Sequence, residues 1–396
     1  MPDLHALYVS DVFFPRVNGV STSIETFRAD LAELGVQTTL VAPDYGQPRT
    51  ARGDVVRVRS RPIPLDPEDR LMDRALLRAA VEAQPERPYD LVHVQTPFVA
   101  HYAGLRAARR FGIPVVATCH THFEDYLHHY LPLLPQAAGR LLARTVMRSQ
   151  FRDVDAVIAP SEQVRDALLG YGLTVPIEVV PTGIPAPRFL PGDGQRFRRE
   201  FGLSRDRPLV LIVGRVAHEK NLRFLLPMFA ELRSLRPDVL VVVAGEGPAR
   251  DWLVAETRRL RLEGTLRLVG NLDRDRTLND CYAAADAFVF ASRTETQGLV
   301  LLEAMAQGRP VVSTACLGTR SVLQPESGAV VVPEQERPFA EAVAAVLADP
   351  GRAARIGAAG LAWARRWSSE AMARRVAGLY EATCSREESC ARRALR

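Results

Sequence analysis

Residues 209–220 read LVLIVGRVAHEK: five apolar residues, then glycine, then a polar turn that leads into a helical pattern. A continuous apolar run of this length, ended by Gly214 and followed by a helix, is typical of a strand buried on both faces of a parallel sheet. The same alternation of strand and helix recurs on both sides of this stretch. The segment therefore predicts an α/β fold in which helices connect parallel strands.

Short runs rich in valine, isoleucine and alanine repeat this pattern in two groups of six. The first group lies near Ala6–Ser10, Thr38–Ala42, Leu91–Gln95, Val115–Cys119, Ala156–Ala159 and Glu178–Val180. The second group lies near Leu209–Val213, Val239–Ala244, Leu266–Val269, Ala287–Phe290, Val311–Thr314 and Val330–Pro333. Each group suffices for one doubly wound, Rossmann-like sheet. We expect two such domains facing a cleft.

The stretch 181–194, PTGIPAPRFLPGDG, is rich in proline and glycine and is the best candidate for a linker. We therefore predict an N-terminal domain over residues 1–185 and a C-terminal domain over residues 186–365. Residues 366–396 are expected to form a helix that returns toward the N-terminal domain. From Ser385 onward we expect this helix to fray.

The 396 residues are 47% hydrophobic and 24% charged, which fits a globular protein. No apolar run approaches the roughly 20 residues that span a bilayer, and the N-terminus lacks the basic and apolar regions of a signal peptide. The five cysteines follow no zinc or redox spacing. We expect a cytoplasmic protein without a disulfide or a structural metal.

The basic residues are almost all arginine: of 51 lysines and arginines, only Lys220 is a lysine. Arg215 and Lys220 both follow a predicted strand, at the edge where open α/β sheets bind ligands. A compact ammonium suits a point contact to a pyrophosphate oxygen better than a planar guanidinium does. Chance retention of one lysine is the alternative, but the position in the fold favours a binding role.

Two turns between a strand and a helix offer backbone amides to an anion. Gly19 follows the first strand, before a helix whose cap we expect at Ser21 or Thr22, and amides there can approach a phosphate. A plain tight turn is the alternative. The second turn precedes a helix that starts near Gly298, with the amides of three residues at its N-terminal end, namely Gly298, Leu299 and Val300.

Two glutamates flank this second turn, at an interval of eight residues. Glu295 lies in the loop and Glu303 lies in the second turn of the following helix. A carboxylate accepts hydrogen bonds from neighbouring hydroxyl groups, which suits a ribose or a hexose. The spacing is weak evidence alone, but its position after a strand of the second group and the Arg215–Lys220 pair strengthen it.

Taken together, these motifs resemble those of the retaining glycosyltransferases of family 4, which have the two-domain GT-B fold. The resemblance covers nearly the whole chain and rests on the segments NGV (18–20), ATCHTHFE (117–124), VPTGI (180–184), GRVAHEK (214–220), GEGP (245–248) and ETQGLVLLE (295–303). It extends to bacterial enzymes that glycosylate diacylglycerol or build mannosyl and glucosyl lipids. Pro185 departs from the family, where many relatives have aspartate, so we assign it no role.

The resemblance implies a role for each matched residue. In similar enzymes the Arg215 and Lys220 positions hold the donor pyrophosphate, and the Glu303 position binds the ribose. The Glu295 position contacts the transferred sugar and the His120 position lies beside it, so these two are the catalytic candidates. A structural histidine at a strand end is the alternative for His120.

Catalysis then needs no nucleophile, because the leaving diphosphate is stabilised by cations and helix amides. The acceptor hydroxyl enters from the same face of the sugar, which retains the configuration. A double displacement through Glu295 or Glu124 stays open. We expect no cofactor and no metal, and we interpret the Asp-x-Asp pairs at 153/155 and 273/275 as surface loops.

The region after His120 is the candidate acceptor side. Tyr126 and His129 belong to an aromatic and apolar stretch that forms either core or an acceptor surface. Arg140, Arg144 and Arg148 then recur every four residues beside apolar residues. On a helix they form a basic stripe suited to anionic lipid; a helix packed on its domain with a solvated arginine face is the alternative.

We therefore expect a hexosyltransferase that is peripheral at the inner face of the cell membrane and binds no nucleic acid. Its partners would be a nucleotide sugar, UDP-hexose first and GDP-mannose second, and a lipid or glycolipid acceptor. The competing enzyme class is a GT-B sugar-nucleotide epimerase or phosphorylase. The competing non-enzyme is a basic scaffold that binds membranes or RNA.

Overall fold

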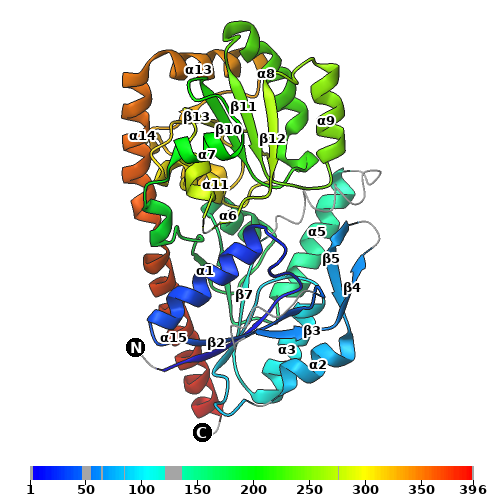
Figure 1. Ribbon diagram of the computed structural model, residues 1–396. Coiled ribbons are helices and arrows are strands. Elements are labelled where there is room, and N and C mark those ends of the chain that lie inside the picture. Colours follow the sequence, from blue (N-terminus) through cyan, green and yellow to red (C-terminus); the bar gives the residue numbers. More distant parts are fainter. Residues whose placement is uncertain are drawn as a thin grey trace. The chain divides into compact units, whose positions relative to one another are not determined.

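The computed structural model describes residues 3–46, 55–63, 66–83, 85–120, 136–274 and 276–394. The chain forms two compact α/β units (Figure 1). The first comprises Met1–Gly183 together with Ser369–Arg396, and the second comprises Ile184–Ser368. The boundaries expected after residues 185 and 365 thus lie after Gly183 and Ser368.

The sheet of the first unit has seven parallel strands in the order β3-β2-β1-β6-β7-β8-β9. Their bounds are β1 His5–Val9, β2 Gln37–Pro43, β3 Val55–Val58, β6 Leu91–Val94, β7 Val115–Thr118, β8 Ala156–Ala159 and β9 Ile177–Val179. The chain builds outward from β1 to β3, and then returns to pair β6 with the other side of β1. Strand order therefore reverses between β1 and β6, and ligands of open α/β sheets bind at the carboxyl ends of such strands.

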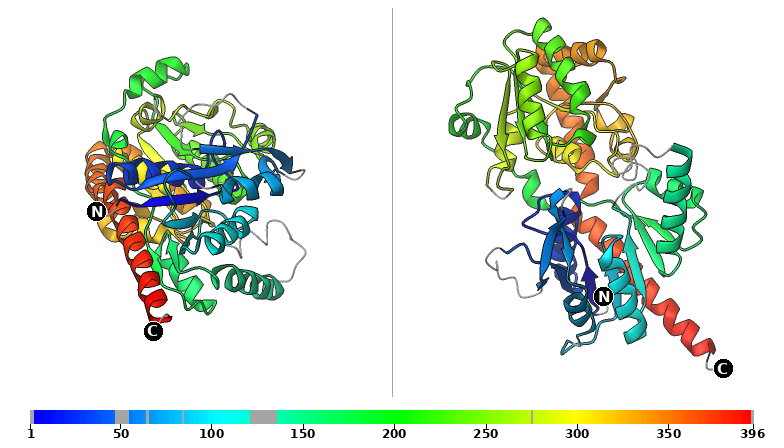
Figure 2. Two further views of the ribbon diagram at one scale, coloured as in Figure 1. Left: turned by 90° about the horizontal axis from the view of Figure 1, so that it is seen from below. Right: turned by 90° about the vertical axis from the view of Figure 1, so that its right-hand side faces the viewer.

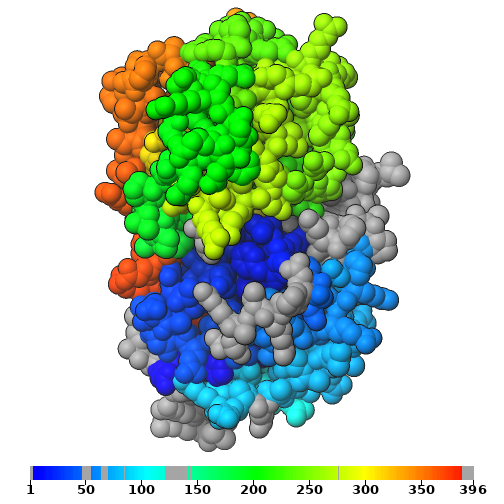
Figure 3. All heavy atoms as spheres, in the orientation of Figure 1, coloured from blue at the N-terminus to red at the C-terminus, as the bar shows by residue number. Residues whose placement is uncertain are grey.

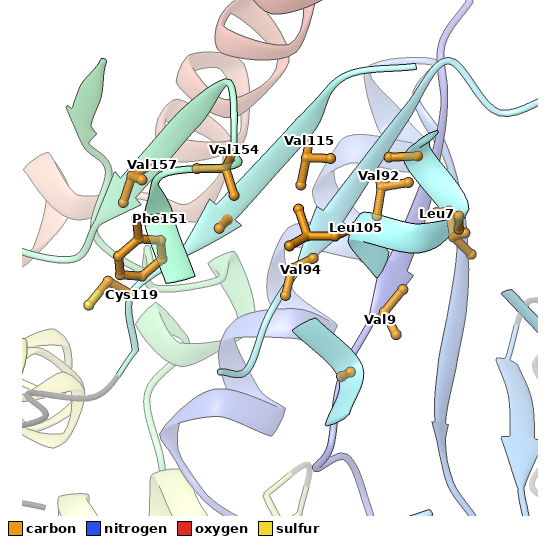
Figure 4. Close-up of a cluster of buried hydrophobic side chains, with 14 of the residues drawn as sticks. Leu7, Val9, Val92, Val94, Leu105, Val115, Cys119, Phe151, Val154 and Val157 are labelled. Carbon is orange, nitrogen blue, oxygen red and sulfur yellow. The ribbon is translucent and has the colours of Figure 1, made fainter. Parts of the chain in front are cut away.

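Helices cover both faces of this sheet. They are α1 Gly19–Glu33, α2 Arg74–Glu82, α3 Val99–Phe111, α5 Gln136–Phe151, α6 Glu162–Gly170 and α15 Ser369–Ala394. On one face, Leu105 of α3 packs among Val92, Val94 and Val115 (Figure 4). α3 lies so close to the sheet that a Cβ on its Gly104 would come within 2.7 Å of Val94.

The other face is covered by α1 and by the C-terminal helix α15, which lie side by side (Figure 2). Tyr380 of α15 is fully buried, and its hydroxyl is 2.7 Å from the hydroxyl of Tyr8 and 2.6 Å from Nδ1 of His93. The last helix is thus part of the first unit's core. Its helical backbone continues to Ala394.

The sheet of the second unit has six parallel strands in the order β12-β11-β10-β13-β14-β15. Their bounds are β10 Leu209–Val213, β11 Leu240–Ala244, β12 Leu266–Gly270, β13 Ala287–Phe290, β14 Val311–Ser313 and β15 Val330–Val331. Strand order reverses here between β10 and β13, as it does between β1 and β6. The same edge of the sheet is therefore the expected ligand site.

The helices of the second unit are α7 Gly194–Glu200, α8 Leu222–Leu235, α9 Arg250–Arg259, α10 Leu278–Ala283, α11 Leu299–Ala306, α12 Thr319–Val322, α13 Glu336–Ala348 and α14 Pro350–Ala364. In the space-filling view, α14 (orange) lies at the edge of this unit's surface (Figure 3). Trp363 of α14 and the nearby Trp367 pack against the core, with ring centroids 6.4 Å apart. The two rings therefore hold the C-terminal end of α14 against the core of the second unit.

Strands appear at all the positions that the apolar runs predicted, but two local predictions failed. The edge strand β3 and an antiparallel hairpin of β4 Ser60–Ile63 and β5 Asp66–Met72 were missed, because arginine, proline and acidic residues interrupt their apolar pattern. The cap of α1 is Asn18, whose side chain accepts from the amide of Ser21 at 2.8 Å. The predicted cap at Ser21 or Thr22 was wrong, since both lie within the first turn.

Two glycines of the GEGP segment allow two loops at strand ends to touch. A Cβ on Gly245 would lie 1.9 Å from the carbonyl oxygen of Gly214, and one on Gly247 would lie 2.5 Å from that of Val216. Both residues also have positive φ, at 144° and 158°. We predict that Gly245→Ala lowers the free energy of unfolding by about 3 kcal/mol.

Urea unfolding measures this loss, and Gly264→Ala is the matched control. Its Cβ would meet no atom within 4 Å, so the change should stay within about 0.5 kcal/mol. Equal stability of the two variants would contradict the packing role of Gly245.

Candidate functional site

A lysine and a glutamate meet where strand order reverses in the second unit. Lys220 ends the short turn His218–Lys220 after β10, and its Nζ donates to Oε1 of Glu295, which follows β13. The two side chains are only 25% and 19% exposed. Burial by itself would lower the pKa of Lys220, but the charge and the hydrogen bond of Glu295, together with the charge of Glu219, outweigh burial, so the pKa lies above its ordinary value. The ammonium is therefore charged at neutral pH.

The turn that carries Lys220 is fixed by the neighbouring loop. The amide of Val216 donates to the carbonyl of Glu246 at 2.9 Å, and the carbonyl of Val216 accepts from Ala249 at 3.0 Å. Arg215 lies in this turn with its side chain 20% exposed, and its Nη1 is 3.6 Å from Oε1 of Glu219. The structure thus brings Arg215, Lys220 and Glu295 to one edge of one sheet.

Helix α11 begins at Leu299, four residues after Glu295, with Gly298 as its left-handed cap at φ 91°. A side chain at Gly298 would meet Leu301 and Thr319 at 3.0 Å, so only glycine fits this corner. The first amides of a helix have no partner within it and carry the positive end of its dipole. The amides of Gly298, Leu299 and Val300 are therefore suited to an anion.

Glu303 lies one turn further along α11 and is 2% exposed. Its Oε1 accepts from Nη2 of Arg274, and its Oε2 accepts from the hydroxyl of Tyr282 at 2.8 Å. Burial, and then the charge of Glu303, raise the pKa of Tyr282 well above its ordinary value, so the phenol remains a donor. Sequence reasoning missed both partners, and the only signal for them was that a buried carboxylate needs donors.

In the first unit, His120 follows β7 and Gly19 follows β1. His120 forms a hydrogen bond from Nε2 to Oε1 of Gln95 at 3.0 Å, and burial lowers its pKa to about 4. The imidazole is thus neutral at pH 7. Gly19 is the first residue of α1, has no positive φ, and a Cβ there would meet no atom within 4 Å. Neither backbone geometry nor packing requires glycine here, which weighs against the tight-turn alternative.

In the first unit, polar groups also join the ends of β1 and β6, the two strands between which strand order reverses. The sequence analysis did not predict this contact. Asp11 follows β1, and Thr96 follows β6. The amide of Asp11 donates to Oγ1 of Thr96 at 2.7 Å, and that hydroxyl donates back to Oδ2 at 2.8 Å. The carboxylate also accepts from Ala100 in the first turn of α3. Burial raises the pKa of Asp11 to about 6.

The predicted basic stripe lies on α5. Arg144 and Arg148 are exposed, and Leu141 and Leu142 beside them are 67% and 40% exposed, whereas Met147 faces the core. Tyr126 and His129 lie outside the described residues, as does the side chain of Arg140. Within the described ranges, no helix combines the length and the apolar character needed to cross a bilayer.

The Asp-x-Asp pairs serve local structure where they are described. Asp153 pairs with Arg109 at 3.2 Å, and Asp155 accepts from the amide of Val115. Asp273 accepts from the amide of Arg276, while Asp275 lies outside the described residues. In the part of the chain that the structure covers, no three His, Cys, Asp or Glu residues are grouped to hold a metal ion.

Comparison with known proteins identifies the family. Residues 17–188 match the model of Glycosyltransferase Family 4, and residues 193–363 match that of Glycosyl transferases group 1. The chain belongs to glycosyltransferase family 4. It is therefore an enzyme, a hexosyltransferase, as the motifs around Lys220 and Glu295 predicted.

Two relatives illustrate the similarity within the family. Alpha-monoglucosyldiacylglycerol synthase of Streptococcus pneumoniae is 32% identical over 314 residues, which cover 77% of this chain and 69% of that protein. GDP-mannose-dependent alpha-mannosyltransferase of Mycobacterium tuberculosis is 29% identical over 369 residues, which cover 90% and 92% of the two chains.

Two solved structures show the same fold. Sucrose-phosphate synthase from Thermosynechococcus elongatus superposes with a TM-score of 0.78 at 23% identity, covering 96% of this chain and 98% of its own. HepE of Anabaena, solved in complex with UDP and glucose, gives 0.75 at 18% identity and covers 96% and 100%. The fold of this family member is thus GT-B, as predicted.

Buried histidines should make the protein sensitive to acid. Burial lowers the pKa of His93 to about 3 and those of His101 and His120 to about 4, and the charge of His120 contributes at His93. As pH falls below about 6.5, the unfolded chain binds protons that the native state does not, so stability is lost. Between pH 7 and 5 each histidine should cost about 2 kcal/mol, while Asp11, with its raised pKa, offsets about 1 kcal/mol.

Urea unfolding at pH 7 and pH 5 measures this loss. His101→Gln should make the loss smaller by about 2 kcal/mol. The same substitution at the exposed His218 is the control. An unchanged loss in His101→Gln would show that His101 does not resist protonation.

Proposed function

We propose that this enzyme transfers a hexose from a nucleotide sugar to the hydroxyl of a lipid or lipid-linked acceptor, with retention at the anomeric carbon. UDP-hexose is the first choice of donor and GDP-mannose the second. The observation that carries the proposal is the pairing of Lys220 with Glu295 at the reversal of the second sheet, with Arg215 in the same turn. The similarity to a diacylglycerol-glycosylating enzyme supports the lipid acceptor.

In the second unit, the donor pyrophosphate would be held by Arg215, Lys220 and the amides that begin α11. Without a donor, Glu295 neutralises Lys220. A pyrophosphate can replace this carboxylate as the partner of the ammonium, which releases Glu295 to accept hydrogen bonds from the sugar hydroxyls. The cations then stabilise the charge that develops on the leaving diphosphate.

Glu303 would bind the ribose of the donor. Arg274 and the hydroxyl of Tyr282 each engage one of its oxygens, which fixes the position of the carboxylate before a ligand arrives. A carboxylate oxygen accepts more than one hydrogen bond. Displacement of Arg274 would open Oε1 to the ribose, while Tyr282 keeps the side chain in place.

At the sugar, His120 and Glu295 would act on the transferred hexose. The acceptor hydroxyl forms the new C–O bond on the face from which the diphosphate leaves, and its proton passes to a phosphate oxygen of the leaving group. No protein nucleophile enters this step.

The lipid acceptor requires contact with a membrane surface, for which α5 is suited. Its exposed leucines can enter the headgroup region while Arg144 and Arg148 contact anionic lipid. The enzyme would then be cytoplasmic and peripheral at the inner face of the membrane. No observation on the chain favours nucleic acid as the ligand.

The donor site is tested by thermal shift with UDP, GDP and ADP and their hexose conjugates, with and without chelator. A ligand at 100 times its Kd stabilises by about 2.7 kcal/mol, and we expect UDP to give the largest shift, unaffected by chelator. Glu303→Ala should lose most of this shift. His120→Ala should keep the shift but lower turnover.

Glu303→Gln is the matched control for burial, because its amide oxygen still accepts from Tyr282. For each variant, the melting temperature with nucleotide is compared with the melting temperature of the same variant without it. This is necessary because Glu303→Ala also removes the buried partner of Arg274 and so lowers stability by itself. Wild-type activity in both Glu303→Ala and His120→Ala would refute the site. No shift with any nucleotide would favour the scaffold alternative.

Membrane binding is tested by sedimentation with vesicles of phosphatidylcholine, with or without phosphatidylglycerol. Each arginine near an anionic surface contributes about 1 kcal/mol, so Arg144→Ala with Arg148→Ala should weaken binding about thirtyfold. Arg199→Ala with Arg258→Ala removes the same charge from exposed positions of the second unit. Equal weakening by both pairs would mean that net charge, and not α5, drives binding.

A further inference from the structure

Four polar side chains form a ladder on two neighbouring strands of the first unit. β6 pairs in parallel with β7, with Val94 opposite Ala117. His93 and Gln95 are two residues apart at the end of β6, and Thr118 and His120 are two residues apart at the end of β7, so each pair shares one face of the sheet. We call these four residues the polar ladder.

Each step of the polar ladder is a hydrogen bond between the strands. Nε2 of His93 is 2.7 Å from Oγ1 of Thr118, and Nε2 of His120 is 3.0 Å from Oε1 of Gln95. The inner step is anchored from α15, because the hydroxyl of Tyr380 is 2.6 Å from Nδ1 of His93. The outer step ends at the candidate catalytic histidine.

Gln95 is buried and its backbone is tied to the sheet. It is 3% exposed, and its backbone N–H donates to the carbonyl of Val9 at 2.9 Å, at the end of the central strand β1. Its Oε1 is a carbonyl oxygen and can only accept. The contact therefore requires the proton of the neutral imidazole to be on Nε2 of His120, which leaves Nδ1 as an acceptor.

We infer that Gln95 is a positioning residue for His120, whose ring it holds in the Nε2-protonated tautomer and in one plane. The inference rests on the proposed function in one respect, the assignment of His120 to the transferred sugar. A ring held this way accepts a hydrogen bond from a sugar hydroxyl at Nδ1. The other tautomer would present an N–H donor at Nδ1, and the ring turned over would place its Cδ2–H group there, so either change would lose that contact.

The tautomer is measured directly from the ring ¹⁵N signals of the full-length protein labelled at histidine, at pH 7.5. The signals of His120 are assigned by their absence in His120→Asn. In the wild type we expect Nε2 to be protonated and Nδ1 unprotonated. In Gln95→Leu, which keeps the volume but removes the acceptor, both signals should move toward the average of the two tautomers.

The kinetic consequence is measured with UDP-glucose and dioleoylglycerol in mixed micelles. Gln95→Leu should lower kcat at least tenfold while the KM for UDP-glucose stays within threefold, because donor binding lies with other residues. Thr118→Val is the matched control: it removes the other step of the polar ladder and should lower the melting temperature. It should leave the His120 signals in place and kcat within twofold.

Three outcomes overturn the inference. The first is a wild-type His120 that is charged or protonated on Nδ1, an outcome that does not depend on any Gln95 variant. The second is a Gln95→Leu variant that keeps the ring signals and kcat while His120→Ala lowers kcat; the proposed function then stands. The third is an equal change in the His120 signals in Thr118→Val, which would make the effect of Gln95 merely structural. Wild-type turnover in His120→Ala would refute the proposed role of His120 itself.

Discussion

The reversal of strand order at the centre of each sheet is the constraint on which the rest of this structure depends. The connections from β1 and β6, and likewise from β10 and β13, leave toward opposite sides of the sheet. No crossover helix passes over their carboxyl ends, so polar residues that follow these strands meet there. Asp11 meets Thr96 in the first unit, and Lys220 meets Glu295 in the second. Both sheets therefore have a polar contact at this place. In the first unit the carboxylate is paired with a neutral hydroxyl, and in the second it is paired with an ammonium.

Burial at these edges makes every charge dependent on a partner. Glu303 is held by Arg274 and Tyr282, and Lys220 by Glu295. An uncompensated buried charge costs several kcal/mol, so the partners keep the site intact without a ligand. A ligand that carries its own negative charge and hydroxyl groups can take the place of these partners. Donor binding then replaces ion pairs within the protein by contacts between the protein and the donor, and no buried charge is left without a partner.

The sequence predicted the parts of the fold and site that have a local pattern. Apolar runs gave the positions of the central strands, and glycine, charge and spacing drew attention to Gly298, Lys220 and Glu303. Contacts between distant segments have no such pattern. Gln95 and His120 are separated by 25 residues, and Arg274 and Glu303 by 29, so their pairing follows only from strand order. The prediction of the cap of α1 failed for a different reason. Asn18, Ser21 and Thr22 are all residue types that cap helices well, so the sequence does not distinguish between them.

The second unit is an insertion within the first, because Ile184–Ser368 is bounded on both sides by segments of the first unit. Val376 and Tyr380 of α15 belong to the core cluster that also contains Tyr8 of β1. During synthesis α15 leaves the ribosome only after the whole second unit has emerged. Domains usually fold in the order of their synthesis. Here the N-terminal strands must wait with part of one face of their sheet uncovered, because α1 alone does not complete it, and the unit that is synthesised second is the first that can complete its core.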